Sequence, residues 1–242
     1  MRGLKDIIFA GVPIITSAVP HRAEDAVRVE REMTGRVEQL SIPLWTEDEL
    51  SDIGTRGFAE LGAVCKPADL SRVAAESFGS PFLMQDFCLQ LCKGNGLRET
   101  SNPPVELVAP PWSEFFKARA GMASKAVFDL LARGPRQRSD RIQRKLKDGR
   151  EGDIYFVVLA AIAATGPVLS LTYEELRAAI REIIASEPPQ RHEVTRVLEE
   201  MTKIAKKVEG EPVVDYDEEL STLHISDPFF AFYLRWGEAS AS

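Results

Sequence analysis

The sequence predicts a mostly α-helical protein with minor β structure, built from folded regions on either side of a linker. Three observations support this fold class. Apolar residues recur at helical spacing through most of the chain after residue 45, two Thr-x-x-Glu signatures begin helices at Thr46 and Thr172, and glycines and prolines cluster in residues 95–111. A chain of 242 residues, 44% of them hydrophobic, is long enough for two modest domains.

The first 45 residues predict two short strands. Residues 6–12 form a mainly apolar run that contains Gly11, which is typical of a strand buried on both faces of a parallel sheet. Residues 37–42 predict the second strand, and residues 24–33 between them predict a polar helix. Because two strands cannot form a stable parallel sheet alone, we expect the rest of the sheet to come from a longer parent protein or from a partner.

Residues 46–94 predict a bundle of three short helices. The first begins at the capping box Thr46–Glu49 and ends at Gly62. Pro67 begins the second helix, and Ser80-Pro81 begins the third, with the serine as cap and the proline in the first turn.

A linker and a basic connector are predicted next, over residues 95–150. After the proline-rich linker, residues 112–131 predict one helix and residues 132–150 the connector. Residues 112–150 hold 11 basic and 4 acidic side chains, whereas the segments on either side are acidic. The connector can bind the phosphates of DNA, or it can pair with its acidic neighbours, and both interpretations stay open. Its candidate DNA contacts are Arg141, Arg144 and Lys145.

Residues 151–242 predict three helices, a β-hairpin and a final aromatic helix. The helices are expected over residues 154–164, after Thr172, and along the apolar stripe of residues 194–208. The hairpin is expected over residues 212–225, and Asp227-Pro228 begins the last helix. Three helices followed by a hairpin is the order of a winged-helix domain, which is a variant of helix-turn-helix.

The third of these helices is the candidate recognition helix. A recognition helix places residues near its N-terminus against base edges and phosphates in the major groove. The residues that suit this role on the face opposite the apolar stripe are Arg191, His192, Arg196 and Lys203. Glutamates interleave with them, so a solvated face or a contact with another protein is an equal alternative.

Five segments resemble a known family, and one of them is Thr34-Gly35-Arg36 with residues 37–42, which is similar to the family's arginine and the short strand after it. The run Ile7-Ile8-Phe9-Ala10-Gly11-Val12 is similar to the sensor strand of AAA+ ATPases in the origin-recognition-like and STAND branch of archaea and bacteria. The run Pro43-Leu44-Trp45-Thr46-Glu47-Asp48-Glu49-Leu50 resembles the opening of the lid, and Gly79-Ser80-Pro81-Phe82 resembles the start of its last helix. The tail from Leu223 to Trp236 is similar to the end of the family's winged-helix region.

The resemblance implies three domains. Residues 1–94 would be the end of an α/β P-loop core and its helical lid, residues 95–150 the linker and basic connector, and residues 151–242 a winged-helix domain. Arg36, Gly79 and Ser80 would then be nucleotide-sensing candidates. Their alternatives are a surface arginine paired with a nearby glutamate, and ordinary helix-start chemistry at Gly79 and Ser80.

One departure limits the activity that the resemblance implies. The phosphate-cradling motif G-x-x-x-x-G-K-[ST] does not occur in the sequence. We therefore expect no catalytic residues and no ATP hydrolysis by this chain alone, with ATP and Mg²⁺ bound in a full-length parent or with a P-loop partner subunit. The expected function is relay of a nucleotide state to DNA, and the alternative is an adaptor that binds a protein partner.

Other functional classes fit the sequence poorly. Three cysteines and three scattered histidines predict neither a disulfide framework nor a metal site, so the cysteines are expected to be buried core thiols. No apolar run reaches the roughly 20 residues of a membrane span, and no signal peptide is evident, so a cytoplasmic location is expected.

Overall fold

The computed structural model describes residues 7, 9–15, 38, 40, 42–135, 142–166, 168–210 and 212–237. The chain divides into two compact units, Met1–Leu44 and Trp45–Ser242. In the described residues helices dominate and the sheets are small, which confirms the predicted fold class of mostly α with minor β structure.

The first unit differs from the two predicted strands. Ile7 and Phe9 are helical, residues 10–11 form a turn, and the Val12 N–H donates to the Ile7 carbonyl at 3.3 Å. The strand predicted over residues 6–12 is therefore wrong for the described residues, because an apolar run of this length suits a helical turn as well as a strand. The described residues of the second predicted strand, Glu38, Leu40 and Ile42, also lie outside any strand.

The second unit begins with the predicted helical bundle. Helix α3 (Glu47–Glu60), helix α4 (Pro67–Ala75) and helix α5 (Pro81–Gly94) pack on one another. Thr46 and Glu49 form the expected capping box at the start of α3. Buried side chains from all three helices, Leu50, Phe58, Val73, Met84 and Phe87, fill the space between them.

A short parallel strand pair closes the bundle. Strand β1 (Ala63–Val64) follows α3, and strand β2 (Val105–Glu106) pairs with it in register Ala63↔Val105. The turn before β1 requires Gly62, whose φ is +65° and whose place for a Cβ is already filled by the carbonyl oxygen of Ser101. The predicted linker thus packs back on the bundle over part of its length.

Residues 112–152 are more broken than predicted. The single helix expected over residues 112–131 is wrong, because the structure has α6 (Trp112–Lys117) and α7 (Met122–Arg133) separated by a turn that ends at Gly121. The basic connector then enters an antiparallel hairpin of β3 (Arg144–Lys145) and β4 (Glu151–Gly152). A bridge between Leu146 and Ile184 joins this hairpin to the end of α9.

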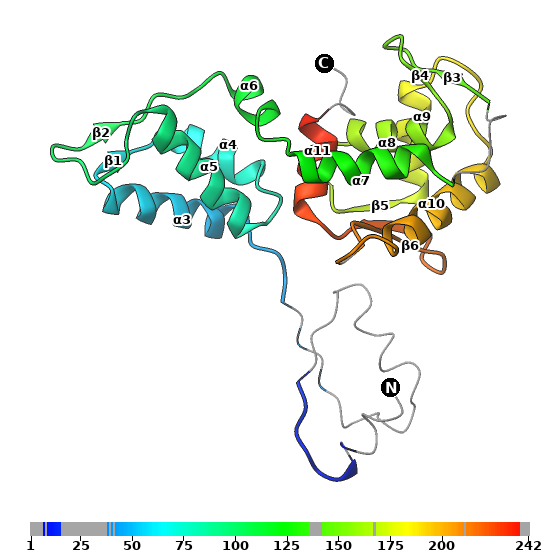
Figure 1. Ribbon diagram of the computed structural model, residues 1–242, viewed down its shortest axis with the longest axis horizontal. Helices are drawn as coiled ribbons and strands as arrows, with labels where there is room; N and C mark the ends of the chain where they lie inside the picture. Colours follow the sequence, from blue (N-terminus) through cyan, green and yellow to red (C-terminus); the bar gives the residue numbers. More distant parts are fainter. Residues whose placement is uncertain are drawn as a thin grey trace. The chain divides into compact units, whose positions relative to one another are not determined.

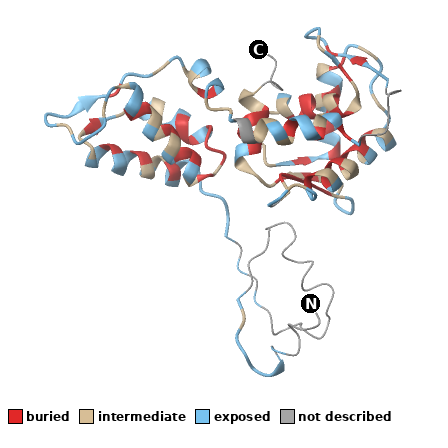
Figure 2. Cartoon of the chain, in the orientation of Figure 1, coloured by how far each residue is buried: buried red, intermediate tan, exposed pale blue. Residues whose placement is uncertain are grey.

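The remaining elements follow the predicted order, with one additional strand. They are α8 (Ile154–Ala164), β5 (Ser170–Thr172), α9 (Tyr173–Ile183), α10 (Arg191–Ala205), β6 (Val214–Asp217), β7 (Thr222–Ile225) and α11 (Pro228–Trp236). The three strands form an antiparallel sheet in the order β5-β7-β6. Helix α8 is apolar nearly all round and almost wholly buried, whereas α10 packs along β6 with one face (Figures 1 and 2).

The bundle and the C-terminal elements meet at an aromatic cluster, which we call the junction: Phe78, Phe87, Phe116, Phe232 and Trp236. Phe232 of α11 lies 5.1 Å from Phe87 and 6.1 Å from Phe116 between ring centroids. At its edge the buried carboxylate of Glu76 accepts hydrogen bonds from Arg235 Nε at 2.9 Å and from Trp236 Nε1 at 2.6 Å. These contacts all lie within the second compact unit, Trp45–Ser242.

Candidate nucleic-acid interface

Helix α10 has one buried and one exposed face. Val194, Val197, Leu198 and Met201 are buried against the rest of the C-terminal elements. The Thr202 hydroxyl also accepts a hydrogen bond from the Tyr216 N–H at 2.9 Å, which fixes the helix on β6. The four predicted contact residues, Arg191, His192, Arg196 and Lys203, are all exposed.

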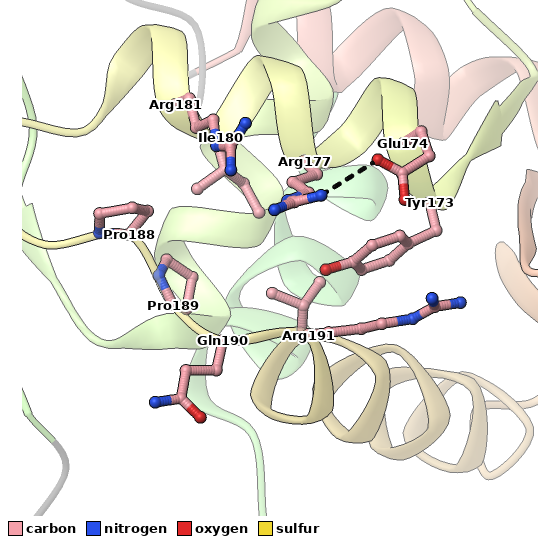
Figure 3. Close-up of a pocket in the computed structure, with 10 residues that line it drawn as sticks. Tyr173, Glu174, Arg177, Ile180, Arg181, Pro188, Pro189, Gln190 and Arg191 are labelled. Atoms are coloured by element: carbon pink, nitrogen blue, oxygen red, sulfur yellow. Dashed lines mark hydrogen bonds and ion pairs between the residues drawn. The ribbon is translucent and has the colours of Figure 1, made fainter.

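A groove of about 320 Å³ lies between α9 and the start of α10 (Figure 3). Arg177 and Arg181 come from α9, Arg191 comes from α10, and Pro188 and Pro189 form the connecting loop. We call this feature the arginine groove. Three guanidinium groups from two helices thus line one cavity, and guanidinium groups are the preferred partners of phosphates in proteins.

The arginines of the groove differ in what they contact. The Arg191 guanidinium lies 4.8 Å from the centroid of the Tyr173 ring, a cation–π contact that keeps its charge. Arg177 forms an ion pair with Glu174 at 3.4 Å, on the exposed surface. For Arg181 no carboxylate in the described part of the chain lies within ion-pair distance. At least one full positive charge in the groove is therefore uncompensated.

The start of α10 adds a favourable field for anions. The N-terminus of a helix carries a partial positive charge and unpaired N–H groups, which attract phosphates. The Glu193 carboxylate already offsets part of this positive charge, because its Oε2 accepts the Gln190 N–H at 2.8 Å. Burial raises the pKa of Glu193, but the Gln190 N–H and the positive charge of Arg144 outweigh burial, and the net effect lowers that pKa.

Arg144 lies away from the solvent, contrary to its expected role. Its side chain is 10% exposed and forms an ion pair with Glu193 at 3.0 Å. This contact connects the β3–β4 hairpin to the start of α10. Arg144 therefore has a structural role and is not positioned to contact a ligand in solvent. Lys145 is exposed and pairs with Glu151 at 3.2 Å, and Lys203 pairs with Glu200 at 2.8 Å.

The other predicted site residues do not join the arginine groove. Arg36 and Arg141 lie outside the described residues. The Ser80 hydroxyl accepts the Leu83 N–H at 3.4 Å at the start of α5, and the Gly79 carbonyl accepts the Trp45 N–H at 3.2 Å. Ser80 thus makes the helix-start contact that was the alternative to nucleotide sensing, whereas Gly79 contacts the residue that precedes the N-cap of α3.

Arg177 and Arg181 were missed by the sequence analysis. Their spacing of four residues places them on one face of α9, beside the buried Leu176 and Ile180. That spacing was visible in the sequence. The approach of this face to Arg191 depends on the angle between α9 and α10, which the sequence pattern does not give.

Other kinds of site find no support in the described residues. No group of three or more histidines, cysteines or carboxylates there is placed to hold a metal ion. Burial raises the pKa of Cys65 to about 11 and that of Cys88 to about 12, so both thiols stay protonated and unreactive at neutral pH. Among the same residues, no helix combines the length and the apolar character that crossing a membrane requires.

Comparison with known proteins gives no further assignment. No protein-family model, curated protein or solved structure matches this chain.

Proposed function

We propose that this chain is the lid and winged-helix portion of an AAA+/STAND-like ATP-binding protein, and that it relays a nucleotide state to DNA. The observation that carries the proposal is the arginine groove at the start of α10, within the order helix, strand, helix, helix and hairpin of residues 154–225. A winged helix presents its third helix to the major groove. Under this proposal, α10 would be that third helix.

The charge of the groove favours a polyanion over a single small anion. Arg181 and Arg191 are exposed cations of the groove, and Arg196 is a further exposed cation on α10. Phosphates spaced along a DNA strand can pair with several such cations at once and release counterions, which supplies most of the sequence-independent affinity.

The junction supports the relay part of the proposal. A lid that moves with nucleotide binding can shift α10 only if the two are mechanically connected. The aromatic cluster around Phe232 and the bonds of Glu76 to Arg235 and Trp236 provide that connection within one compact unit. The relay would use ATP and Mg²⁺ held by a full-length parent or a P-loop partner, because the sequence contains no phosphate-cradling motif.

The resemblance that motivates this proposal now rests on fewer residues. Its first segment, expected as a sensor strand, is helical at Ile7 and Phe9 and turns at residues 10–11. The lid opening at Thr46, the helix start at Ser80-Pro81 and the tail with Asp227 as cap of α11 keep the local structures expected of them.

A salt titration of binding to random duplex DNA tests the proposal. We expect the wild-type chain to bind at low salt, with the logarithm of affinity falling linearly as the logarithm of salt concentration rises. Arg181→Glu and Arg196→Glu should each weaken binding and reduce the magnitude of that slope by about 1. Arg98→Glu is the matched control, since it makes the same charge change on an exposed arginine of the lid region. No binding at low salt, or losses in Arg181→Glu and Arg196→Glu no larger than in the control, would reject DNA binding through α10.

One observation favours the adaptor as second candidate. Phe82 and Phe229 are 65% and 40% exposed, and their ring centroids lie 5.5 Å apart at the surface near the junction. Aromatic residues are enriched in protein interfaces. If the chain is an adaptor, Phe82→Ser should abolish a partner's binding, whereas Arg181→Glu should leave it unchanged.

A further inference from the structure

A second cavity lies in the lid region, far from the arginine groove in sequence. It is a groove of about 440 Å³ between α3 and α5, which we call the lid groove. Its walls are apolar: Ile53, Phe58, Leu61, Leu89 and Leu97. The DNA relay proposed above makes no use of it.

The cations of the lid groove lie near the end of α5. Lys93 and Arg98 both line it and both are exposed. In the described part of the chain, neither has a carboxylate within ion-pair distance. A long apolar wall that ends at two uncompensated positive charges is complementary to a molecule with an apolar body and an anionic head.

The walls add no opposing negative charge. Cys88 and Cys92 line the groove between the apolar side chains. Burial raises the pKa of Cys88 to about 12 and also raises that of Cys92, so both thiols are neutral at neutral pH. The net charge of the lining side chains is therefore set by Lys93 and Arg98.

The shape favours a small ligand over a protein helix. A volume of about 440 Å³ falls within the roughly 300–1,000 Å³ of small-molecule pockets. Leu89 is 50% exposed, whereas Ile53, Leu61 and Leu97 are partly buried and Phe58 is buried. Apart from Leu89, the apolar side chains of the groove are thus at least partly buried.

We propose that the lid groove binds a small amphiphilic anion, with an aliphatic body between α3 and α5 and a carboxylate or similar head held by Lys93 and Arg98. The body contributes affinity by burying apolar surface, and the head contributes selectivity through two charge-assisted contacts. Ligand binding would thereby stabilise the α3–α5 pair within the lid region.

Gly57 offers a direct way to block the groove. It lines the cavity near the end of α3, and a Cβ at this position would have no atom within 4 Å. The Cβ of Gly57→Leu therefore has open space, the rest of the side chain is expected to occupy the groove, and the change also favours the helix. Gly94→Leu is the matched control, because Gly94 lies in α5, has equally open space and does not line the cavity.

The experiment is a calorimetric titration of the full chain with dodecanoate below its micellar concentration. Dodecanol and dodecyltrimethylammonium serve as neutral and cationic comparisons with the same tail. We expect saturable dodecanoate binding, at least tenfold weaker binding of the cationic amphiphile, and retained binding in Gly94→Leu. Gly57→Leu should abolish binding, and Lys93→Glu with Arg98→Glu should weaken dodecanoate at least tenfold while leaving dodecanol unchanged.

Three results would overturn the proposal. They are the absence of saturable binding by the wild-type chain, equal affinity for the anionic and cationic amphiphiles, and unaltered binding in Gly57→Leu. The last result would mean that the amphiphile binds elsewhere. Wild-type circular dichroism and melting temperature for Gly57→Leu would show that a loss of binding comes from a filled groove and not from unfolding.

Discussion

Replacing Glu76 by alanine should weaken the attachment between the helical bundle of α3 to α5 and the C-terminal elements. The Glu76 carboxylate accepts hydrogen bonds from Arg235 and Trp236 and is buried. Removal of the carboxylate would leave both donors without this acceptor. It would also leave the Arg235 charge without the carboxylate that faces it.

The magnitude follows from the burial of the two partners. Breaking a fully buried ion pair costs about 3–5 kcal/mol. Arg235 keeps 34% of its side chain exposed, so water can replace part of the lost interaction. A hydrogen bond to a charged group contributes about 1.5–3 kcal/mol to stability. We therefore expect the free energy of unfolding to fall by about 2–3 kcal/mol. For a unit of this size that corresponds to a fall in Tm of about 4–12 °C.

Thermal unfolding followed by circular dichroism measures this change. Glu99→Ala is the control, because Glu99 is an exposed carboxylate of the linker, and we expect its Tm to stay near that of the wild type. Arg235→Ala should cost less in the Glu76→Ala background than in the wild type, since the shared contact is then already lost. A Glu76→Ala protein as stable as Glu99→Ala would refute the stabilising role of this contact.

Two further predictions concern local structure. Gly62→Ala should destabilise the chain by about 1–3 kcal/mol in urea unfolding, because φ at this position is +65° and a Cβ would overlap the Ser101 carbonyl oxygen. Gly94→Ala, with open space and helical backbone, should be neutral or slightly stabilising, and equal effects of the two changes would contradict this reasoning. Hydrogen bonds from the hydroxyl and then the backbone N–H of Thr172 lower the pKa of Glu175 below its usual 4.5. The hydrogen bonds stabilise the fold at pH values above 4.5, and this stabilisation is lost as pH falls through the lowered pKa of Glu175. The difference in stability between the wild type and Glu175→Ala should therefore shrink in acid. A difference that stays constant with pH would contradict this reasoning.

Local signals in the sequence predicted the helix starts well. The capping boxes at Thr46 and Thr172 and the cap at Asp227 are formed as expected, because each depends on residues within four positions of one another. The hairpin of β6 and β7 was also predicted, since residues 212–216 and 222–225 lie on either side of an acidic turn. Strand β5 has three residues and lacked a comparable signal.

Features that depend on distant residues could not be predicted. The apolar run around Ile8 gave the wrong secondary structure, because an isolated run of that length is ambiguous between strand and helix. Of the candidate site, the sequence identified Arg191 but not its approach to Arg177 and Arg181 across two helices. The contact between Glu76 and Arg235 joins positions 159 residues apart, and no periodic pattern encodes such a pair.

The carboxyl group of Glu193 has two duties that cannot be changed independently. One oxygen accepts the N–H of Gln190 at the first turn of α10, and the other faces the guanidinium of Arg144 on the β3–β4 hairpin. Pulling the hairpin away would remove the counter-charge of the capping carboxylate and alter the field at the helix start. A displacement of the hairpin would therefore change the stability of the first turn of α10, which begins with Arg191.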